Sequence, residues 1–263
     1  MTDKIKIAVD AMGGENSPKK IIEGIKISLK TNIENRFFLF GNENLLNKEI
    51  NKDNLLKKHC EIINAEDVIL DNESPLSAAK KSKKTSMWKA IESQKNKLTD
   101  VSISAGNTGA LLVISRIILS TIKGINKPAL AGLWPNKYSM NIVLDLGANV
   151  ECDDKTLVDF ACMGSSLSKS LFQIDTPKIA LLNIGLEENK GNNTLKKTFN
   201  ILKNNHDKNF NFLSELYENK IDNLFSEFLK FSVIKLAVPS AVFNATFPVK
   251  PSVTITSAFP SII

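Results

Sequence analysis

The feature that most constrains the fold is a repeated alternation of short apolar runs with helical patterns, which continues to about residue 213. The apolar run at residues 5–10 is followed by apolar residues at helical spacing over residues 21–29, with Ser17 and Pro18 placed to begin that helix. Strands that alternate with helices in this way are typical of an α/β fold with a mostly parallel sheet.

The same alternation predicts the later elements. Further strands are expected at residues 37–40, 101–104, 129–134, 140–146, 178–184 and 210–213. Helices are expected at residues 76–95, 108–120, 154–172 and 194–202. Residues 214–230 retain an amphipathic helical pattern, but from Phe231 onward prolines interrupt every run and the only charged residues are lysines. We therefore expect an α/β domain over residues 1–213 and an irregular tail over residues 214–263.

Composition favours a soluble protein of a reducing compartment. No stretch has the length and purity of a membrane span, and Cys60, Cys152 and Cys162 form no CxxC pair, so we expect a cytoplasmic protein without a disulfide framework or zinc site. The net charge of +6 comes from a general excess of lysine, which gives no reason to expect a nucleic-acid partner. The lysine cluster at residues 80–84 is either a solvated helix face, the favoured interpretation, or a docking surface.

Four of the expected strands end in small, amide or carboxylate residues. The four segments are residues 10–14, 104–110, 145–149 and 183–185. Ligands of open parallel sheets bind at the edge formed by the carboxyl ends of the strands, so four such ends predict one shared site. A single glycine after a strand would more simply permit a tight turn, but four together favour a site.

The segment from Gly106 to Ala110 has the clearest chemical meaning. A glycine-rich turn that enters a helix presents backbone N–H groups at the positive end of the helix dipole, which suits a phosphate group, and Asn107 and Thr108 add side-chain donors there. No GxGxxG fingerprint and no P-loop follow a strand, so the anion is expected to be small or to belong to a less common class. Both histidines lie away from the glycine turns and no GxSxG motif is present, so a histidine base or a serine hydrolase is not expected.

These segments resemble the phosphate acyltransferases of bacterial phospholipid synthesis. The matching segments are residues 9–14, 104–111, 127–131, 144–150 and 181–185, Glu187, Lys190 and Gly191, and residues 197–202. The resemblance covers residues 1–213. It implies a three-layer α/β/α fold with a mostly parallel sheet, like that of isocitrate and isopropylmalate dehydrogenases and of phosphate acetyltransferases. It also implies a fold that is incomplete at its C-terminus here, since nothing in residues 214–263 matches the Asp-Gly-Phe-x-Gly-Asn segment of the family.

The resemblance implies the transfer of a fatty acyl group from acyl carrier protein to inorganic phosphate, which gives an acyl phosphate for phospholipid synthesis. The expected partners are acyl carrier protein, phosphate and a second copy in a homodimer, with peripheral association with the membrane and no metal or organic cofactor. The site assignment is a hypothesis in which Lys190 and Asn183 are catalytic. The substrate-binding residues are Gly106, Asn107, Thr108, Gly109, Asn149 and Asp10. For Asp10 and the equivalent Asp145, we favour fixing of loops by hydrogen bonds over proton transfer.

Two other functions stay open at this point. One is a truncated, inactive chain that retains only phosphate or carrier-protein binding, because the missing family segment belongs to the same site. The other is a relative that acts on short acyl thioesters such as acetyl-CoA.

Overall fold

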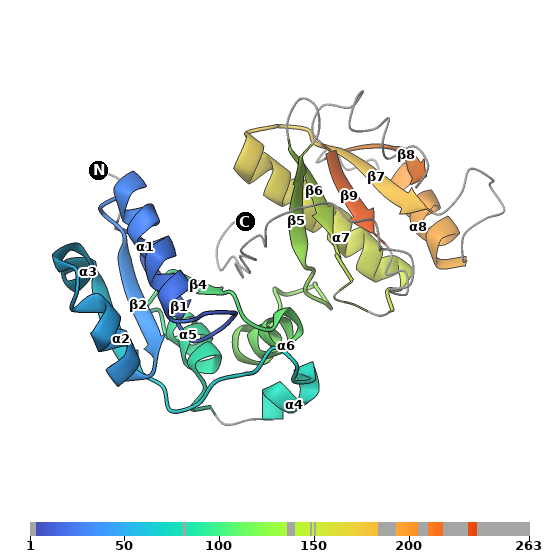
Figure 1. The fold of residues 1–263 in the computed structure, drawn as a ribbon. Coiled ribbons are helices and arrows are strands. Elements are labelled where there is room, and N and C mark those ends of the chain that lie inside the picture. The colour runs from blue at the N-terminus through green and yellow to red at the C-terminus, as the bar shows by residue number, and fades with distance from the viewer. Residues whose placement is uncertain are drawn as a thin grey trace. The chain divides into compact units, whose positions relative to one another are not determined.

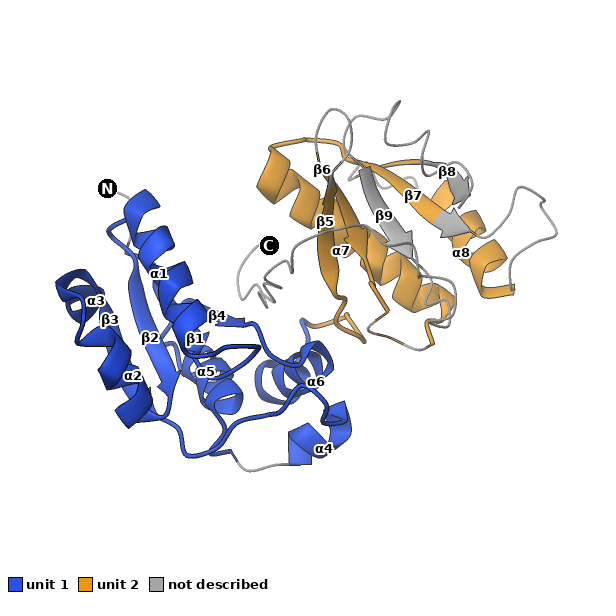
Figure 2. Cartoon of the chain, in the orientation of Figure 1, with its two compact units in different colours: residues 1–122, 249–263 blue, residues 123–248 orange. Residues whose placement is uncertain are grey.

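The computed structural model of the chain describes residues 4–80, 83–135, 140–147, 149, 151–183, 193–204, 210–217 and 231–235. These residues form two compact units that divide between Ile122 and Lys123 and are coloured separately in Figure 2. Each unit has its own β-sheet with helices packed against it, so both units are α/β (Figure 1).

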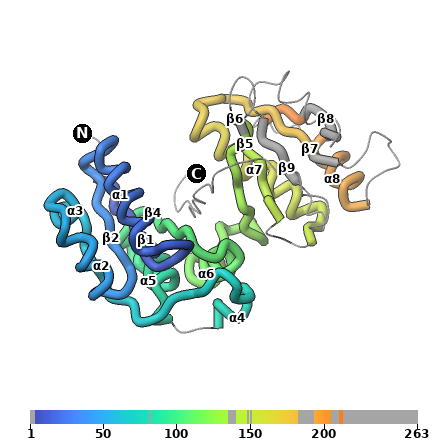
Figure 3. The backbone as a smooth tube through the Cα atoms, in the orientation of Figure 1, coloured from blue at the N-terminus to red at the C-terminus, as the bar shows by residue number. Residues whose placement is uncertain are grey.

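The sheet of unit 1 is entirely parallel and has the strand order β3-β2-β1-β4. Its strands are β1 (Lys6–Asp10), β2 (Arg36–Gly41), β3 (Cys60–Asn64) and β4 (Val101–Ser104). β4 pairs with β1, although β2 and β3 lie between them in the sequence. Figure 3 follows the crossover that makes this possible, from β3 through α4 (Pro75–Lys80) and α5 (Ser86–Lys95) to β4.

Helices cover both faces of this sheet. The helices of the first layer are α1 (Lys19–Thr31), α2 (Glu43–Ile50) and α3 (Asn54–His59). They pack against the sheet face that carries Val9 and Leu39. α5 packs against the opposite face, where Ala90 lies with Ala8 and Phe40. Neighbouring residues of a strand point to opposite faces of the sheet. Val9 therefore packs against the first layer of helices, and Ala8 packs against α5. Unit 1 is therefore a three-layer α/β/α structure, as predicted.

The region between β3 and β4 differs from its prediction. The sequence predicts one helix over residues 76–95, but the structure has two, α4 and α5. Thr85 begins the second helix, because its hydroxyl oxygen accepts a hydrogen bond from the amide of Trp88 at 3.3 Å. α6 (Thr108–Leu119) follows β4 within one residue of its predicted bounds and packs against α4 and α5.

The sheet of unit 2 is mostly parallel and has the order β5-β6-β9-β7-β8. Its strands are β5 (Ala131–Pro135), β6 (Met140–Leu144), β7 (Lys178–Asn183), β8 (Asn211–Tyr217) and β9 (Phe231–Lys235). Among the described strands of this unit, only β5 runs antiparallel to its neighbour. α7 (Asp154–Phe172), whose bounds are those predicted, and α8 (Asn193–Lys203) complete the unit. A core that includes Ile142, Phe160 and Ile179 joins α7 to the sheet.

Several local predictions need correction. Residues 214–217 belong to β8 rather than to a helix, and residues 231–235 form β9 rather than an irregular tail. The other residues after 213 lie outside the described part of the chain, so the domain boundary at residue 213 stays a prediction. Ser17 does not cap α1: its hydroxyl donates to the carbonyl oxygen of Gly13 at 2.6 Å. Within the described residues, no helix is both long and apolar enough to cross a bilayer.

Candidate functional site

The parallel pairing of β1 and β4 brings two of the predicted segments together in unit 1. In this register Asp10 lies opposite Ser104, so the strands end side by side at one edge of the sheet. The glycine turns that follow the two strands, at residues 11–14 and 105–107, are therefore neighbours. The sequence prediction that these two strand ends meet is confirmed.

The carboxylate of Asp10 is buried between these turns, with 1% of its surface exposed. It accepts a hydrogen bond from the hydroxyl of Ser104 at 2.7 Å and a longer one from the amide of Met12 at 3.4 Å. Burial raises the pKa of Asp10, and the neighbouring hydroxyls of Ser86 and Ser104 oppose that rise. The carboxylate of Asp10 thus holds the two turns together through hydrogen bonds with Met12 and Ser104. These hydrogen bonds do not include the contact with substrate that was predicted for Asp10.

The two turns are packed so closely that glycine is needed at the contact. A Cβ atom on Gly13 would lie 2.5 Å from Oδ2 of Asp10 and 3.0 Å from the amide nitrogen of Gly106. A Cβ atom on Gly14, which has φ +87°, would lie 2.6 Å from the carbonyl oxygen of Ala105. These glycines therefore permit direct backbone packing between the turns, besides the turn conformation itself.

Asn107 ends the second turn and begins α6. Its Oδ1 atom accepts a hydrogen bond from the amide of Ala110 at 2.9 Å, which is the usual arrangement of a helix N-cap. Its Nδ2 atom donates to the carbonyl oxygens of Asp71 and Glu73, at 3.0 and 2.8 Å, with a longer contact to that of Leu70. The side-chain amide of Asn107, one of the two side-chain donors predicted to bind phosphate, is thus engaged with the loop at residues 70–73 in this structure.

The donors that remain at this helix terminus are the hydroxyl of Thr108 and backbone amides. Within the described residues, no acceptor faces the N–H groups of Thr108 and Gly109, the first two residues of α6. Thr108 is exposed, and Gly109 is half-buried against Pro75, whose Cγ atom would lie 2.6 Å from a Cβ atom at Gly109. Two open N–H groups at the positive end of a twelve-residue helix suit a small anion.

Unit 2 holds the third predicted segment, which follows β6. Asp145 is fully buried and adopts φ +60°, and its Oδ1 atom accepts hydrogen bonds from both the amide and the side-chain Nδ2 of Asn149, each at 3.1 Å. Nδ2 of Asn149 also donates to the carbonyl oxygen of Pro128 at 2.9 Å. Asn149, predicted to orient substrate, therefore closes a loop in which Gly147 has φ +83°.

Cys152 lies beside the same carboxylate. Its Sγ atom donates to Oδ2 of Asp145 at 3.6 Å, a long contact for a weak donor. Burial, with the negative charge of Asp145 as a second cause, raises the pKa of Cys152 to about 11. The thiol therefore stays protonated at neutral pH and is a poor nucleophile.

The fourth segment is described only in part. Asn183 is the last residue of β7, while Gly185 and Lys190 lie outside the described residues. β6 and β7 run parallel with β9 between them, so their carboxyl ends lie at the same edge of the second sheet. The prediction that all four strand ends share one sheet is wrong, because they fall in two pairs on two sheets. Whether the two pairs serve one substrate stays a prediction.

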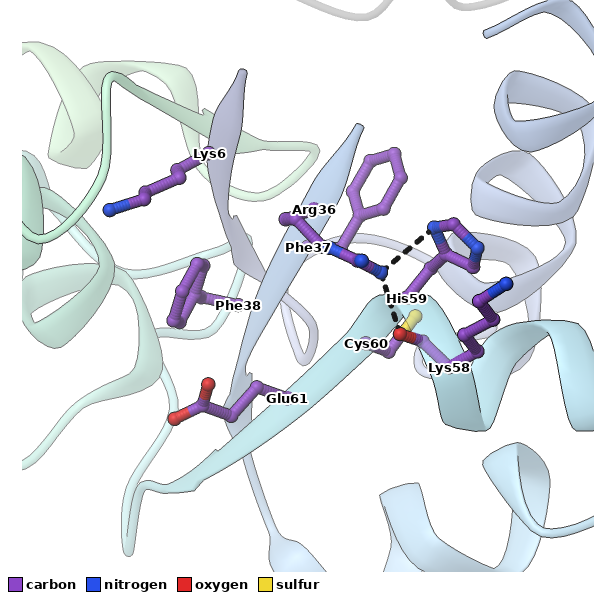
Figure 4. A pocket seen from close by; sticks show the side chains of 8 residues that line it. All are labelled: Lys6, Arg36, Phe37, Phe38, Lys58, His59, Cys60 and Glu61. Atoms are coloured by element: carbon purple, nitrogen blue, oxygen red, sulfur yellow. Dashed lines mark hydrogen bonds between the residues drawn. The ribbon is translucent and has the colours of Figure 1, made fainter. Parts of the chain in front are cut away.

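A hollow of about 350 Å³ lies at the opposite, amino-terminal edge of the first sheet (Figure 4). Arg36 crosses it and donates through Nη1 to the carbonyl oxygen of Lys58 at 2.7 Å and contacts Nδ1 of the buried His59 at 3.1 Å. His59 thus lies far along the strands from the glycine turns, as expected, whereas His206 lies outside the described residues. Nothing in this hollow adds to the candidate site.

The arrangement of strands and helices is similar to that of two solved phosphotransacylases. The EutD phosphotransacetylase from Staphylococcus aureus superposes with a TM-score of 0.57 at 15% identity, over 81% of this chain and 69% of that chain. A branched-chain phosphotransacylase from Enterococcus faecalis V583 superposes with a TM-score of 0.59 at 15% identity, over 88% of this chain and 79% of that chain. At this level of identity the likeness shows the fold.

Sequence similarity gives the family. Residues 5–223 match the family described as fatty acid synthesis protein, and the chain belongs to that family. A phosphate acyltransferase of Pelagibacter ubique (strain HTCC1062) is 52% identical over 223 residues, which are 85% of this chain and 66% of that protein. A phosphate acyltransferase of Neorickettsia sennetsu is 39% identical over 213 residues, which are 80% of this chain and 62% of that protein. The chain thus spans 62–66% of the length of these two curated relatives.

Proposed function

We propose that this chain transfers a fatty acyl group from acyl carrier protein to inorganic phosphate. The observation that carries the proposal is the pair of open amides at Thr108 and Gly109, which offer a phosphate-sized anion a place at the start of α6. The names of the relatives in Pelagibacter and Neorickettsia support the reaction class. The proposed setting is a homodimer in the cytoplasm that associates peripherally with the membrane.

The proposed chemistry needs no covalent enzyme intermediate. A phosphate oxygen attacks the thioester carbonyl, the C–S bond of the tetrahedral intermediate breaks, and the carrier protein leaves as its thiolate. Phosphate is already an anionic nucleophile at neutral pH, so the protein contributes position and stabilisation of the oxyanion rather than a strong base. This role fits a site made of amides and a lysine.

Each predicted site residue keeps a role in this proposal. The Gly106–Gly109 segment binds phosphate through the amides of Thr108 and Gly109 and the Thr108 hydroxyl, while Asn107 holds the segment in place through its cap. Lys190 neutralises charge where the acyl group joins phosphate. Asn149 and Asn183 orient the carbonyl or the phosphate oxygens, and Asp10 fixes the first turn.

Replacing Lys190 tests the proposal by activity. Lys190→Ala should lower turnover of acyl-ACP with phosphate by roughly a hundredfold or more, the scale of one lost electrostatic contact in a transition state. Lys178→Ala is the matched control, because Lys178 is an exposed lysine at the first position of β7, and this variant should turn over like the parent chain. Acyl phosphate formed from acyl-ACP is measured as a function of time. Unchanged turnover in Lys190→Ala removes that residue from the mechanism.

The same assay separates the other two functions. Acetyl-CoA used faster than acyl-ACP would indicate a short-chain enzyme. Binding of phosphate or carrier protein without any acyl phosphate would indicate a chain that retains only binding.

A further inference from the structure

Ser104 is a buried residue that links the carboxylate of Asp10 to the second glycine turn of unit 1. It is 3% exposed, and it lies at the end of β4 directly opposite Asp10. Its hydroxyl donates to Oδ2 of Asp10 at 2.7 Å, and its oxygen accepts the amide of Gly106 at 3.1 Å. One hydroxyl thus joins a buried carboxylate to the turn that precedes α6.

The direction of these bonds follows from the charge state of Asp10. When Asp10 is ionised, its carboxylate only accepts hydrogen bonds, so the Ser104 hydrogen points to Asp10. A lone pair of the same oxygen then faces the N–H of Gly106, which can only donate. Hydrogen bonds to a charged partner are shorter and stronger than neutral ones, and in this relay the bond between Ser104 and Asp10 is buried.

Packing couples the relay to the rest of the turn. The backbones of Gly13 and Gly106 are so close that a Cβ atom on Gly106 would lie 3.1 Å from Cα of Gly13. Gly106 stands two residues before Thr108, and the intervening Asn107 is held by its own cap and by the loop at residues 70–73. A displacement of the Ser104 side chain would therefore also displace the backbone amides of Thr108 and Gly109 at the start of α6.

We infer that Ser104 is a positioning residue, which together with Asp10 aims the amides of Thr108 and Gly109 at the phosphate. This inference rests on the proposed function, since it gives that site its supporting residues. Misplacing binding groups by about 1 Å can cost up to about a hundredfold in rate, so loss of the relay should be visible in kinetics.

The chain offers a matched control for Ser104→Ala. Ser102 lies two residues earlier on the same face of β4, is 4% exposed, and donates to the carbonyl oxygen of Ala90 at 3.0 Å. Ser102→Ala therefore removes an equally buried hydroxyl and one hydrogen bond, but leaves both glycine turns untouched. Urea unfolding of each full-length variant confirms that the compared proteins are folded.

The measurement is the dependence of initial rate on phosphate and on acyl-ACP separately. Ser104→Ala should raise the KM for phosphate about tenfold and leave the KM for acyl-ACP within about twofold, while Ser102→Ala changes neither. Equal effects of the two substitutions would show that Ser104 only stabilises the fold and would overturn the inference. If Ser104→Ala does not fold, Asp10→Asn applies the same test, since it keeps the side-chain shape and replaces one acceptor oxygen.

A second readout distinguishes this inference from the proposed function. Inorganic phosphate should raise the melting temperature of the parent chain and of Ser102→Ala, and do so much less for Ser104→Ala. If the parent chain shows that stabilisation but no turnover, the proposed reaction fails and the positioning role stands. If phosphate stabilises all three proteins equally, or none, the positioning role is wrong.

Discussion

Asp10 and Asp145 are buried at the ends of parallel strands in different units, yet they hold their loops in different ways. Asp10 bonds across to Ser104 on the neighbouring strand, which is distant in sequence. The carboxylate of Asp145 accepts hydrogen bonds from Asn149 and Cys152, which follow it closely in the chain. The first carboxylate ties two turns together, and the second fastens the loop that directly follows it.

The glycines of the two regions differ accordingly. Gly14 and Gly147 have nearly the same positive φ, +87° and +83°. A Cβ atom on Gly14 would strike the Ala105 carbonyl oxygen at 2.6 Å, whereas one on Gly147 would meet no described residue within 4 Å. Close packing thus adds to the need for glycine at Gly14, and at Gly147 the described surroundings leave only the backbone conformation. The same sequence pattern, a strand followed by Asp and Gly, therefore marks two physical situations.

The largest expected effect tests this difference in glycines. Gly14→Ala should lower the free energy of unfolding by about 3 kcal/mol, because it adds overpacking to the cost of a left-handed alanine. Gly147→Ala should cost only about 1 kcal/mol, the conformational part. Each unit carries one tryptophan, Trp88 and Trp134, so fluorescence during urea unfolding can follow each unit once the other tryptophan is replaced by Phe. Equal losses of unfolding free energy in the two variants would show that close packing at Gly14 adds nothing to the cost of the substitution.

A smaller, pH-dependent effect is expected from Asp10. Its pKa is raised by burial, so the folded state binds the proton more tightly than the unfolded state. The stability that Asp10 contributes is therefore present below the unfolded value of about 3.8 and is lost as pH rises through the folded pKa. Relative to Asp10→Asn, the parent chain should lose up to about 1.4 kcal/mol per pH unit within that window.

Urea unfolding of both proteins between pH 4 and pH 8 measures this difference. A constant difference across the range would contradict the raised pKa. The absolute offset between the two proteins is not informative, because Asn also alters the bonds with Met12 and Ser104.

The smallest expected effect concerns the thiol beside Asp145. Asp145→Asn removes a negative charge that contributes to the raised pKa of Cys152, so iodoacetamide at pH 8 should label Cys152 several-fold faster. Cys60, whose pKa burial raises to about 12, is the internal control in unit 1 and should label at an unchanged rate. Mass spectrometry of the labelled peptides gives both rates. An unchanged rate at Cys152 would show that burial alone protects the thiol.

The fold class was predictable because the periodicity of apolar residues reports local structure. The bounds of α7 were found to the residue, since a long amphipathic stretch follows a clear capping residue, Asp153. β3 was missed because it is a short, half-exposed edge strand whose apolar residues are flanked by the exposed Glu61 and Asn64. The division into two sheets was missed as well, because periodicity does not say which strands pair, and β9 enters the second sheet from a segment broken by prolines.

The candidate site was predictable to the level of segments but not of atoms. The meeting of the Asp10 and Ser104 segments follows from parallel pairing. The use of the Asn107 side chain by the loop at residues 70–73 could not be predicted, since that loop has no distinctive sequence and approaches only in the folded unit. Ser104 was placed in the predicted segment at residues 104–110 but given no role, because a serine at a strand end gives no chemical signal until its neighbours are known.

The reversed direction of β5 determines what fastens the Asp145 loop. Since β5 runs antiparallel to β6, its first residue, Ala131, pairs with Leu144, and the chain just before it arrives where β6 ends. The carbonyl oxygens of Pro128 and Leu130 can thereby accept hydrogen bonds from Asn149 and Asp145. A deletion upstream of β5 would consequently loosen a loop that comes many residues later, so the length of this lead-in segment is under structural constraint although it belongs to no helix or strand.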